Sequence, residues 1–274
     1  MNPSAGRILI ITSNFWPEPT GIAVYATDLA ENLVSKCYDV TVLTGLPHYP
    51  WWKVPAEFSN FGEGLKTHNG ISVIRVNHRI PVKVNAFSRI GYEFSLWKNF
   101  LKMSKTLQHQ NYDAVISFIP TLAAGIVGRK YSKNSKTSFG VIVQDLSGVG
   151  ARQSGLRGGT FVAKLAQSIE RFVLRSANRL IVASPPIREV VIDLGVNREK
   201  ITLVPNYSAK VIRCFESNFL RGKFDWNVRD FIVIHTGNIG AKQGLENVIE
   251  ASKYLVRSPR IKIYLIGHGN RESE

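Results

Sequence analysis

The stretch that decides the fold runs from Phe231 to Gly269. It begins Phe231-Ile-Val-Ile-His-Thr236, continues Gly237-Asn238-Ile239-Gly240-Ala241-Lys242-Gln243-Gly244, and after a helical pattern over Leu245–Leu255 closes with Ile261-Lys-Ile-Tyr-Leu-Ile-Gly267-His268-Gly269. Two runs rich in β-branched residues that flank a glycine-rich turn and a helical pattern predict one βαβ unit. The glycines fall where a backbone must approach another group closely.

The chain before this stretch predicts a complete α/β domain, because short apolar strands alternate with helices in it. The predicted strands are Arg7–Thr12, Asp39–Thr44, Ile71–Val76, Asp113–Ile119, Thr137–Gln144, Arg179–Ser184 and Ile201–Val204. The predicted helices are Ile22–Leu33, Val82–Gln108, Thr121–Tyr131, Thr160–Ala177 and one that opens at Pro185-Pro186. We therefore expect a domain over residues 1–205, a linker over 206–228 and the start of a second domain over 229–274.

Composition and charge bound the class of protein. The 274 residues are 44% hydrophobic and 20% charged, as in a globular protein, and the net charge is +15. Such a basic excess favours anionic partners: nucleic acid, a phosphorylated small molecule or an anionic membrane surface. Cys37 and Cys214 show no metal-ligand spacing and fit a reduced compartment. No apolar run approaches the ~18 residues of a spanning helix, so we expect a soluble or peripheral protein.

The turn after the first predicted strand offers a possible anion site. Gly21 stands where the first helix starts, so free N–H groups and the positive end of the helix dipole face the loop. A simple turn-closing role for Gly21 explains the residue equally well. The second strand ends Leu43-Thr44-Gly45 with no acidic residue, and the first turn has one glycine, so nicotinamide dinucleotide binding is disfavoured.

The connection Gly45–Gly64 is long and contains His48-Tyr49-Pro50-Trp51-Trp52. Long loops in compact domains are usually functional, and aromatic faces beside a histidine suit polar ring substrates. A proline-stiffened loop whose tryptophans cover the core is the equal alternative. Gln144-Asp145 ends another strand, where ligands of parallel sheets bind, so Asp145 is interpreted as functional rather than as a loop cap.

The helix over Val82–Gln108 carries a basic stripe. Lys98, Lys102 and Lys105 lie at i, i+4 and i+7, beside the apolar Trp97 and Phe94. Basic residues next to aromatic ones are typical of a helix on an anionic membrane interface. A core-facing helix with a solvated lysine side is the alternative, and the overall charge favours membrane contact slightly.

These motifs together resemble the family-4 glycosyltransferases of the GT-B fold, and more narrowly the bacterial exopolysaccharide enzymes of the colanic-acid type. The residues that carry the likeness are Pro17-Glu18-Pro19-Thr20-Gly21-Ile22, Pro47-His48-Tyr49-Pro50, Gln144-Asp145, Pro205-Asn206 and, above all, Gly237–Ala251. The resemblance covers essentially the whole chain. It implies two Rossmann-like domains that face each other across a cleft.

The resemblance also implies a site. The turn that opens the second domain holds the donor diphosphate, so Gly237, Asn238, Lys242 and Gln243 are donor-binding candidates, and the turn at Gly267 and Gly269 joins them. Family members commonly carry Arg and Lys where this chain has Asn238 and Gln243, which leaves Lys242 as the source of positive charge.

On the first domain, Thr20 and Gly21 are placed by similarity near the donor phosphates. Gln144 and Asp145 occupy the position where many relatives carry His-Asp beside the reacting sugar, and they are the catalytic candidates. Glu18, His48 and Tyr49 are the acceptor-binding candidates.

The chemistry that the resemblance implies is transfer from a nucleotide sugar with a departing diphosphate. Backbone N–H groups, a helix terminus and a cation would stabilise that leaving charge. Family members of this kind are retaining and metal-independent, and this sequence has no Asp-x-Asp pair. We therefore expect no metal and no cofactor other than the nucleotide-sugar substrate.

The family pattern continues past the Gly267-x-Gly269 turn with a Glu-x7-Glu motif that holds the donor's sugar and nucleoside. Residues 1–274 contain the acceptor domain and the first diphosphate loop of that pattern, so we expect a truncated form with impaired activity. One βαβ unit cannot bury both faces of its sheet. We expect residues after about Asn206 to be loosely held or to pack against another partner.

Three functions follow in order of preference. The first is transfer of a sugar to a lipid-linked glycan acceptor at the inner, cytoplasmic face of a bacterial membrane, with the protein held peripherally on the anionic surface. The second is a non-catalytic acceptor- or membrane-binding subunit that needs a separate donor-domain chain. The third, nucleic-acid binding, has no motif in its favour, so no specific nucleic-acid partner is expected.

Overall fold

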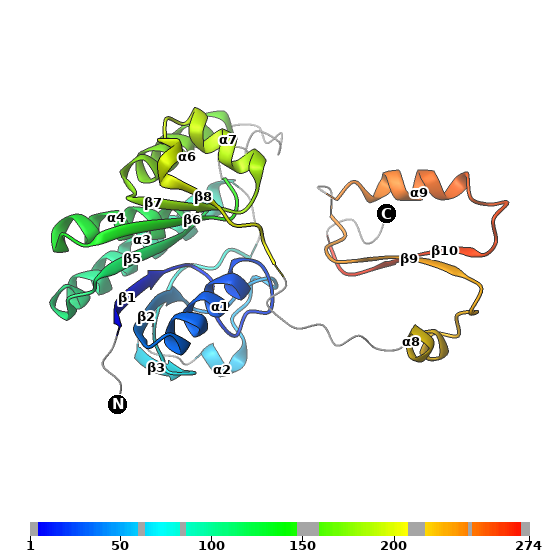
Figure 1. Ribbon diagram of the computed structural model, residues 1–274, viewed down its shortest axis with the longest axis horizontal. Helices are drawn as coiled ribbons and strands as arrows, with labels where there is room; N and C mark the ends of the chain where they lie inside the picture. The colour runs from blue at the N-terminus through cyan, green and yellow to red at the C-terminus, as the bar shows by residue number, and fades with distance from the viewer. Residues whose placement is uncertain are drawn as a thin grey trace. The chain divides into compact units, whose positions relative to one another are not determined.

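The computed structural model describes residues 5–59, 64–82, 86–146, 159–207, 217–240 and 243–269. The chain divides into two compact units, Met1–Ala209 (unit 1) and Lys210–Glu274 (unit 2). In Figure 1 the elements of unit 1 run from blue to yellow and those of unit 2 from gold to red. Each unit is described by itself.

Unit 1 is built on an eight-stranded sheet of order β3-β4-β2-β1-β5-β6-β7-β8. All neighbours pair in parallel except the edge strand β3, which is antiparallel to β4. The strands are β1 Gly6–Ile11, β2 Tyr38–Gly45, β3 Gly64–His68, β4 Ile71–Val76, β5 Ala114–Ile119, β6 Ser138–Val143, β7 Arg179–Val182 and β8 Ile201–Leu203.

Helices cover both faces of this sheet (Figure 1). The described helices are α1 Ile22–Ser35, α2 Ala56–Ser59, α3 Ala86–Leu107, α4 Leu122–Ser135, α6 Gly159–Ser176 and α7 Pro185–Asp193, with 3-10 turns η1 Gln108–Gln110 and η2 Arg198–Lys200. Period-2 alternation along the strands divides the core in two. Leu9 and Ile11 pack with α3, α4 and α6, whereas Ile8 and Ile10 pack on the other face with α1.

The strand order reverses beside β1. The chain runs outward from β1 through β2 to β4, then returns to place β5 on the other side of β1. In open parallel sheets the carboxyl ends of strands at such a switch point form the ligand-binding crevice. The loops after β1 and β5 are therefore the first place to look for a site.

Unit 2 contains helix α8 Ser217–Lys223 and one βαβ unit, β9 Phe231–Thr236, α9 Leu245–Lys253 and β10 Ile261–Ile266. The strands β9 and β10 pair in parallel, Phe231 opposite Ile261 through Thr236 opposite Ile266. Both faces of this two-stranded sheet carry apolar side chains, and several stay exposed: Phe231 at 67%, Val233 at 39%, Ile234 at 45% and Ile266 at 48%. A single βαβ unit leaves this surface open, as the sequence predicts.

The α/β class and the large parallel sheet are confirmed. The sequence missed α2, which lies inside the connection predicted over 45–64, and β3, which begins at the last residue of that connection. Helix α3 begins at Ala86 rather than at Val82. Helix α8 lies within the range predicted as a linker. The boundary between the compact units falls after Ala209, and the predicted division at 205 and 228 stays a prediction.

Candidate functional site

A chain of polar side chains crosses the switch point of unit 1. The hydroxyls of Ser13, after β1, and Thr121, after β5, lie 2.6 Å apart. Because Ser13 Oγ donates to Asn14 Oδ1 at 2.6 Å, Thr121 is the donor of the pair. Asn14 Nδ2 in turn donates to Glu18 Oε1 at 3.2 Å. The two central strand ends are thereby linked to the loop that enters α1.

Glu18 links the loop that enters α1 to the loop that follows β2. Its Oε1 also accepts the backbone N–H groups of His48 and Tyr49, each at 2.7 Å. The residue is 6% exposed, and its Oε2 has no hydrogen-bond partner among the described residues. A buried carboxylate that accepts several N–H bonds is held in one orientation, so Glu18 positions the His48–Tyr49 loop.

Hydrogen bonds to Leu46 fix the orientation of two histidines beside this carboxylate. His48 Nδ1 donates to the carbonyl of Leu46 at 2.9 Å, and His78 Nδ1 accepts from the N–H of Leu46 at 3.3 Å. The proton of neutral His78 is therefore on Nε2, which is buried without a partner among the described residues. Burial, with a further contribution from the nearby His48, lowers the pKa of His78 to about 3.

An aromatic cluster encloses the two imidazoles. The Tyr92 ring on α3 lies 5.4 Å from His48 and 5.3 Å from His78, and the Trp52 ring lies 5.5 Å from His48. Burial raises the pKa of Tyr92 well above its ordinary value. His48 itself is 2% exposed, so the loop presents Tyr49 at 36% and Trp51 at 69% to solvent rather than the imidazole.

Gly21 and Tyr49 lie together at the start of α1. Gly21 has φ +67° and ψ −145°, and a Cβ there would come 3.3 Å from Tyr49 Cε1. No side chain caps the helix, and Thr20 and Gly21 are exposed, so the first N–H groups of α1 are open to a ligand. The structure thus brings a predicted donor residue and a predicted acceptor residue side by side.

The predicted catalytic pair lies at the end of β6. Gln144 is half-buried and its N–H donates to the carbonyl of Ile119 at 3.2 Å. Asp145 is exposed, and its Oδ1 accepts the N–H of Leu146 at 2.8 Å. Asp145 therefore caps its own loop and still presents carboxylate to solvent, which fits both roles that the sequence allowed.

In unit 2 the turns after β9 and β10 pair backbone to backbone. The N–H of Gly237 donates to Ile266 and the N–H of Ile239 donates to His268, both at 3.0 Å. A Cβ on Gly267 would come 1.7 Å from the carbonyl oxygen of Gly237, and one on Gly269 would come 1.8 Å from that of Ile239. These glycines let the turns meet, and the pairing uses two of the amides that the sequence assigned to a diphosphate.

The side chains of this glycine-rich turn contact each other. Asn238 Nδ2 donates to Gln243 Oε1 at 3.1 Å. Gly244 stands at the N-cap of α9 with φ +60° and no capping side chain. Lys242 lies outside the described residues. The diphosphate site at this turn stays a prediction.

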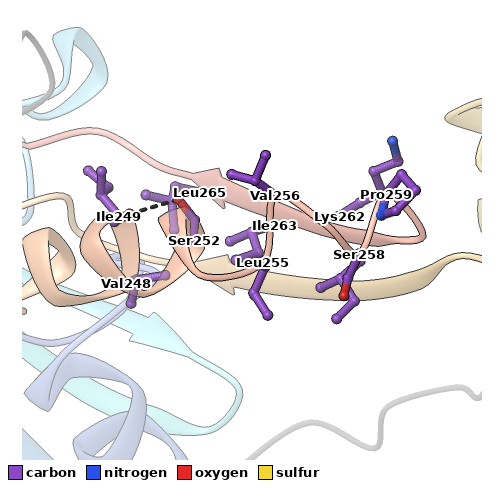
Figure 2. A pocket seen from close by; sticks show the side chains of 11 residues that line it. Val248, Ile249, Ser252, Leu255, Val256, Ser258, Pro259, Lys262, Ile263 and Leu265 are labelled. Atoms are coloured by element: carbon purple, nitrogen blue, oxygen red, sulfur yellow. Dashed lines mark hydrogen bonds between the residues drawn. The ribbon is translucent and has the colours of Figure 1, made fainter.

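A groove of about 390 Å³ lies between α9, the segment after it and β10 (Figure 2). The apolar Val248, Leu255, Ile263 and Leu265 line it together with the polar Ser252, Ser258 and Lys262. It lies on the face of the sheet that α9 covers incompletely.

On helix α3, which was predicted to face the membrane, the lysines are exposed to solvent but the tryptophan is not. Lys98, Lys102 and Lys105 are exposed. Trp97 is half-buried and packs against the core, while Phe94, 5.6 Å from it, is 61% exposed. Of the two aromatic residues predicted beside the lysines, Phe94 is the exposed one, and the membrane-facing role of this helix stays a prediction. Among the described helices, none is long and apolar enough to cross a bilayer.

Glu93, also on α3, was not predicted. Its Oε2 accepts the N–H of Ala123 at 2.9 Å, so a carboxylate from one helix caps the start of another, α4. Burial raises the pKa of Glu93 to about 7, against the opposing effect of these N–H bonds. The sequence also missed Ser13, Asn14, Thr121 and His78. A signal was present for Ser13, Asn14 and Thr121, because these polar residues come within three positions of the ends of β1 and β5, but not for His78.

The sequence matches the profile of a known protein family. The family profile described as a glycosyl transferase 4-like domain matches residues 20–207. WcaI of Escherichia coli (strain K12), a candidate colanic acid biosynthesis glycosyl transferase, is 30% identical over 275 residues, which cover 96% of this chain and 66% of that protein.

Solved structures agree in fold. Sucrose-phosphate synthase from Thermosynechococcus elongatus matches with a TM-score of 0.64 at 16% identity, over 96% of this chain and 62% of the other. HepE from Anabaena, solved with UDP and glucose, matches with a TM-score of 0.59 at 15% identity, over 96% and 61%. The chain thus spans about two thirds of the length of these proteins.

Proposed function

The chain belongs to the glycosyl transferase 4-like family, and from that premise we propose that it transfers a sugar from a nucleotide-sugar donor to a lipid-linked glycan acceptor in exopolysaccharide synthesis. The fold is that of the GT-B glycosyltransferases. The family match over residues 20–207 is the observation that carries the proposal. The complex of HepE with UDP supports a nucleotide as the donor's carrier.

The donor end of the reaction is assigned to unit 2. The N-terminus of α9, behind Gly244, offers N–H groups and a positive dipole end for a leaving diphosphate. Within unit 1, the N-terminus of α1, behind Thr20 and Gly21, is proposed as a separate anion-binding group. Lys242 is the proposed cation, and Gly237, Asn238, Gln243, Gly267 and Gly269 shape the turn. The transfer is retaining and uses neither a metal nor a further cofactor in this proposal.

The acceptor end is assigned to the loops of unit 1. Tyr49 offers an exposed ring, while the buried Glu18 and His48 hold that loop in place. Gln144 and Asp145, at the end of β6, are proposed to face the reacting sugar, since Asp145 keeps a solvent-facing carboxylate.

Titration of the isotopically labelled chain with UDP and GDP, followed by amide chemical shifts, tests this assignment. We expect the largest shifts at Asn238, Gly240 and the first residues of α9, and smaller ones with inorganic phosphate. Shifts confined to other parts of the chain contradict the donor site. A transfer assay with labelled nucleotide sugars tests the reaction class itself, and transfer of the labelled sugar supports it.

The second function, acceptor or membrane binding without catalysis, is favoured by one observation. The exposed Lys98, Lys102 and Lys105 follow α3 beside the exposed Phe94, which suits peripheral attachment to the anionic inner face of a membrane. Co-purification with a second chain that supplies the remaining donor domain would distinguish this function from catalysis by a single polypeptide.

Vesicle sedimentation tests the membrane surface. Replacing all three α3 lysines with Gln should weaken binding to anionic vesicles about tenfold or more, because each cation near such a surface contributes ~1 kcal/mol. The matched control replaces Lys130, Lys133 and Lys136 of the α4 region, which removes equal charge elsewhere. Equal loss in both variants would show attraction by net charge rather than by α3.

A further inference from the structure

Unit 1 has a cavity away from the loops described above. It measures about 220 Å³ and lies between the edge strand β3, its neighbour β4, helix α2 and the residue Trp16 that follows β1. The lining residues that matter are Trp16, Glu57, Phe58, Lys66, His68 and Arg75. None of them belongs to the predicted donor, acceptor or membrane residues.

The cavity contains a buried cation. Arg75 is 4% exposed, and its guanidinium donates to the carbonyl oxygens of Gly45, at 3.2 Å, and of Trp16. Among the described residues no carboxylate lies within ion-pair distance, although Glu18 is close enough to interact electrostatically. Burial lowers the pKa of Arg75 to about 10. A buried charge without a direct counterion is stabilised by an anion that enters the cavity.

The walls are aromatic. Trp16 stacks on His68 with ring centroids 4.1 Å apart and an interplanar angle of 16°. Phe58 is buried, and the Arg75 guanidinium carbon lies 5.2 Å from its ring centroid. Aromatic walls with a few convergent polar groups are typical of small-ligand sites, and ring faces suit the C–H faces of a sugar.

Charged side chains of both signs surround the mouth of the cavity. Lys66 on β3 and Glu57 on α2 are exposed beside the mouth, and His68 Nε2 lies 3.2 Å from Glu31 Oε1. The volume is below the ~300–1,000 Å³ of drug-sized ligand sites, so the occupant is about one sugar ring.

The cavity is connected to the acceptor loop through two residues. Trp16 belongs to the same turn as Glu18, and Arg75 holds the carbonyl of Trp16 while interacting with Glu18. Glu18 in turn binds the amides of His48 and Tyr49. A ligand that contacts Arg75 and Trp16 would therefore touch the same turn whose Glu18 holds the loop that presents Tyr49.

We propose that this cavity is a subsite for one anionic sugar unit of the acceptor, whose carboxylate or phosphate meets Arg75 and Lys66 and whose ring lies against Trp16. The subsite rests on the proposed transferase function for the identity of the larger molecule. Binding of a single anionic sugar to unit 1 requires neither the donor nor turnover.

Calorimetric titration of the full chain without nucleotide tests the subsite. The probes are a methyl glucuronide, glucose 1-phosphate, the neutral methyl glucoside and inorganic phosphate. We expect at least one anionic sugar to bind about tenfold or more tighter than the neutral one, because a charge-assisted hydrogen bond contributes ~1.5–3 kcal/mol. The preferred anionic probe distinguishes a uronate from a sugar phosphate. Equal binding of neutral and anionic sugars, binding of phosphate as tight as that of the sugars, or no binding overturns the proposal.

Variants locate the binding. Lys66→Gln should weaken the preferred anionic sugar about threefold or more, and Thr67→Phe, which places a ring at the exposed mouth, should abolish binding. Lys133→Gln on α4 removes the same charge from another surface and should change nothing. If Lys66→Gln and Lys133→Gln behave alike, the cavity is not the site. Arg75→Gln is a weaker test, because its loss also releases two carbonyls.

Failure of the subsite and failure of the transferase function are separable. Sugar binding that responds to Lys66 and Thr67, in a chain that binds no nucleotide, supports the subsite and contradicts the transfer reaction. Nucleotide binding at α9 without any sugar binding in the cavity supports the transfer reaction and contradicts the subsite.

Discussion

Both units use the same βαβ arrangement, but they differ in what covers their sheets. In unit 1 the central strands are buried on both faces, and residues such as Leu9 and Ile10 have no exposed surface. In unit 2 the equivalent strands carry similar residues, yet Phe231 and Ile266 stay largely exposed. Local sequence alone therefore forms the element, whereas the number of neighbouring elements decides how firmly it is held.

The largest expected effect compares equal truncations in the two sheets. Leu9→Ala on β1 should lower the free energy of unfolding by about 3 kcal/mol, because it leaves a cavity in a closed core. Leu265→Ala on β10 should lower it by less than about 1 kcal/mol, since that side chain faces an open groove. Hydrogen exchange resolved by peptide measures both. Equal loss of protection in the two units would contradict the view that the core of unit 1 is closed and the sheet of unit 2 is open.

The second prediction concerns how each unit fixes its loops. Glu18→Ala should destabilise unit 1 by about 2–3 kcal/mol, because it leaves the amides of His48 and Tyr49 unpaired and Arg75 without its nearest anion. Asn238→Ala breaks the exposed contact with Gln243 and should cost under about 0.5 kcal/mol. Urea unfolding measures both variants, with Glu18→Gln as an isosteric control. It shows whether the hydrogen bonds of Glu18 stabilise their loop more than the Asn238–Gln243 contact stabilises its turn.

The third prediction uses pH. His78 has a folded pKa of about 3, below the 6.5 of a free imidazole, so the unfolded chain takes up this proton first as pH falls. The stability associated with neutral His78 is complete above pH 6.5 and is lost progressively as pH falls toward 3. At pH 5 the loss is about 2 kcal/mol. His78→Asn, whose amide oxygen can accept from Leu46, should flatten this slope.

The control for that experiment is the exposed His109→Asn, which removes an imidazole from η1. Urea midpoints at pH 5 and pH 7 measure both variants. If His78→Asn keeps the slope of the unchanged protein, the imidazole is not buried as described.

The fourth prediction compares the two helix-start glycines. Gly21→Ala should destabilise unit 1 by about 2 kcal/mol, because φ +67° with ψ −145° is close to glycine-only and the Cβ presses on Tyr49. Gly244→Ala, in the ordinary left-handed region, should cost about 1 kcal/mol. Thermal unfolding compares them; a larger effect at Gly244 would contradict the view that unit 2 is the less constrained.

Periodicity predicted most of the fold because its strands are buried runs and its helices carry regular apolar faces. Strand β4 matches its predicted bounds, Ile71–Val76, whereas β3 escaped notice because Gly64–His68 is an exposed edge strand with little apolar character. Similarly, α2 is a single turn, too short for a helical period to appear.

The candidate site was predicted in its residues but not in its connections. Resemblance selected Glu18, His48 and Tyr49, yet it could not show that one carboxylate oxygen holds the two amides. Arg75 lies inside a strand and drew no notice, because its importance comes from neighbours that the sheet order brings together. Such contacts between distant segments leave no local pattern.

The close meeting of the turns after β9 and β10 limits how this protein can vary. Since no atom beyond the backbone fits at Gly267 or Gly269, these two positions are closed to substitution and to chemical labelling. Asn238 and Gln243, by contrast, carry exposed side chains that touch each other. Mutant libraries that test the proposed donor site should therefore vary 238 and 243 as a pair and leave both glycines intact.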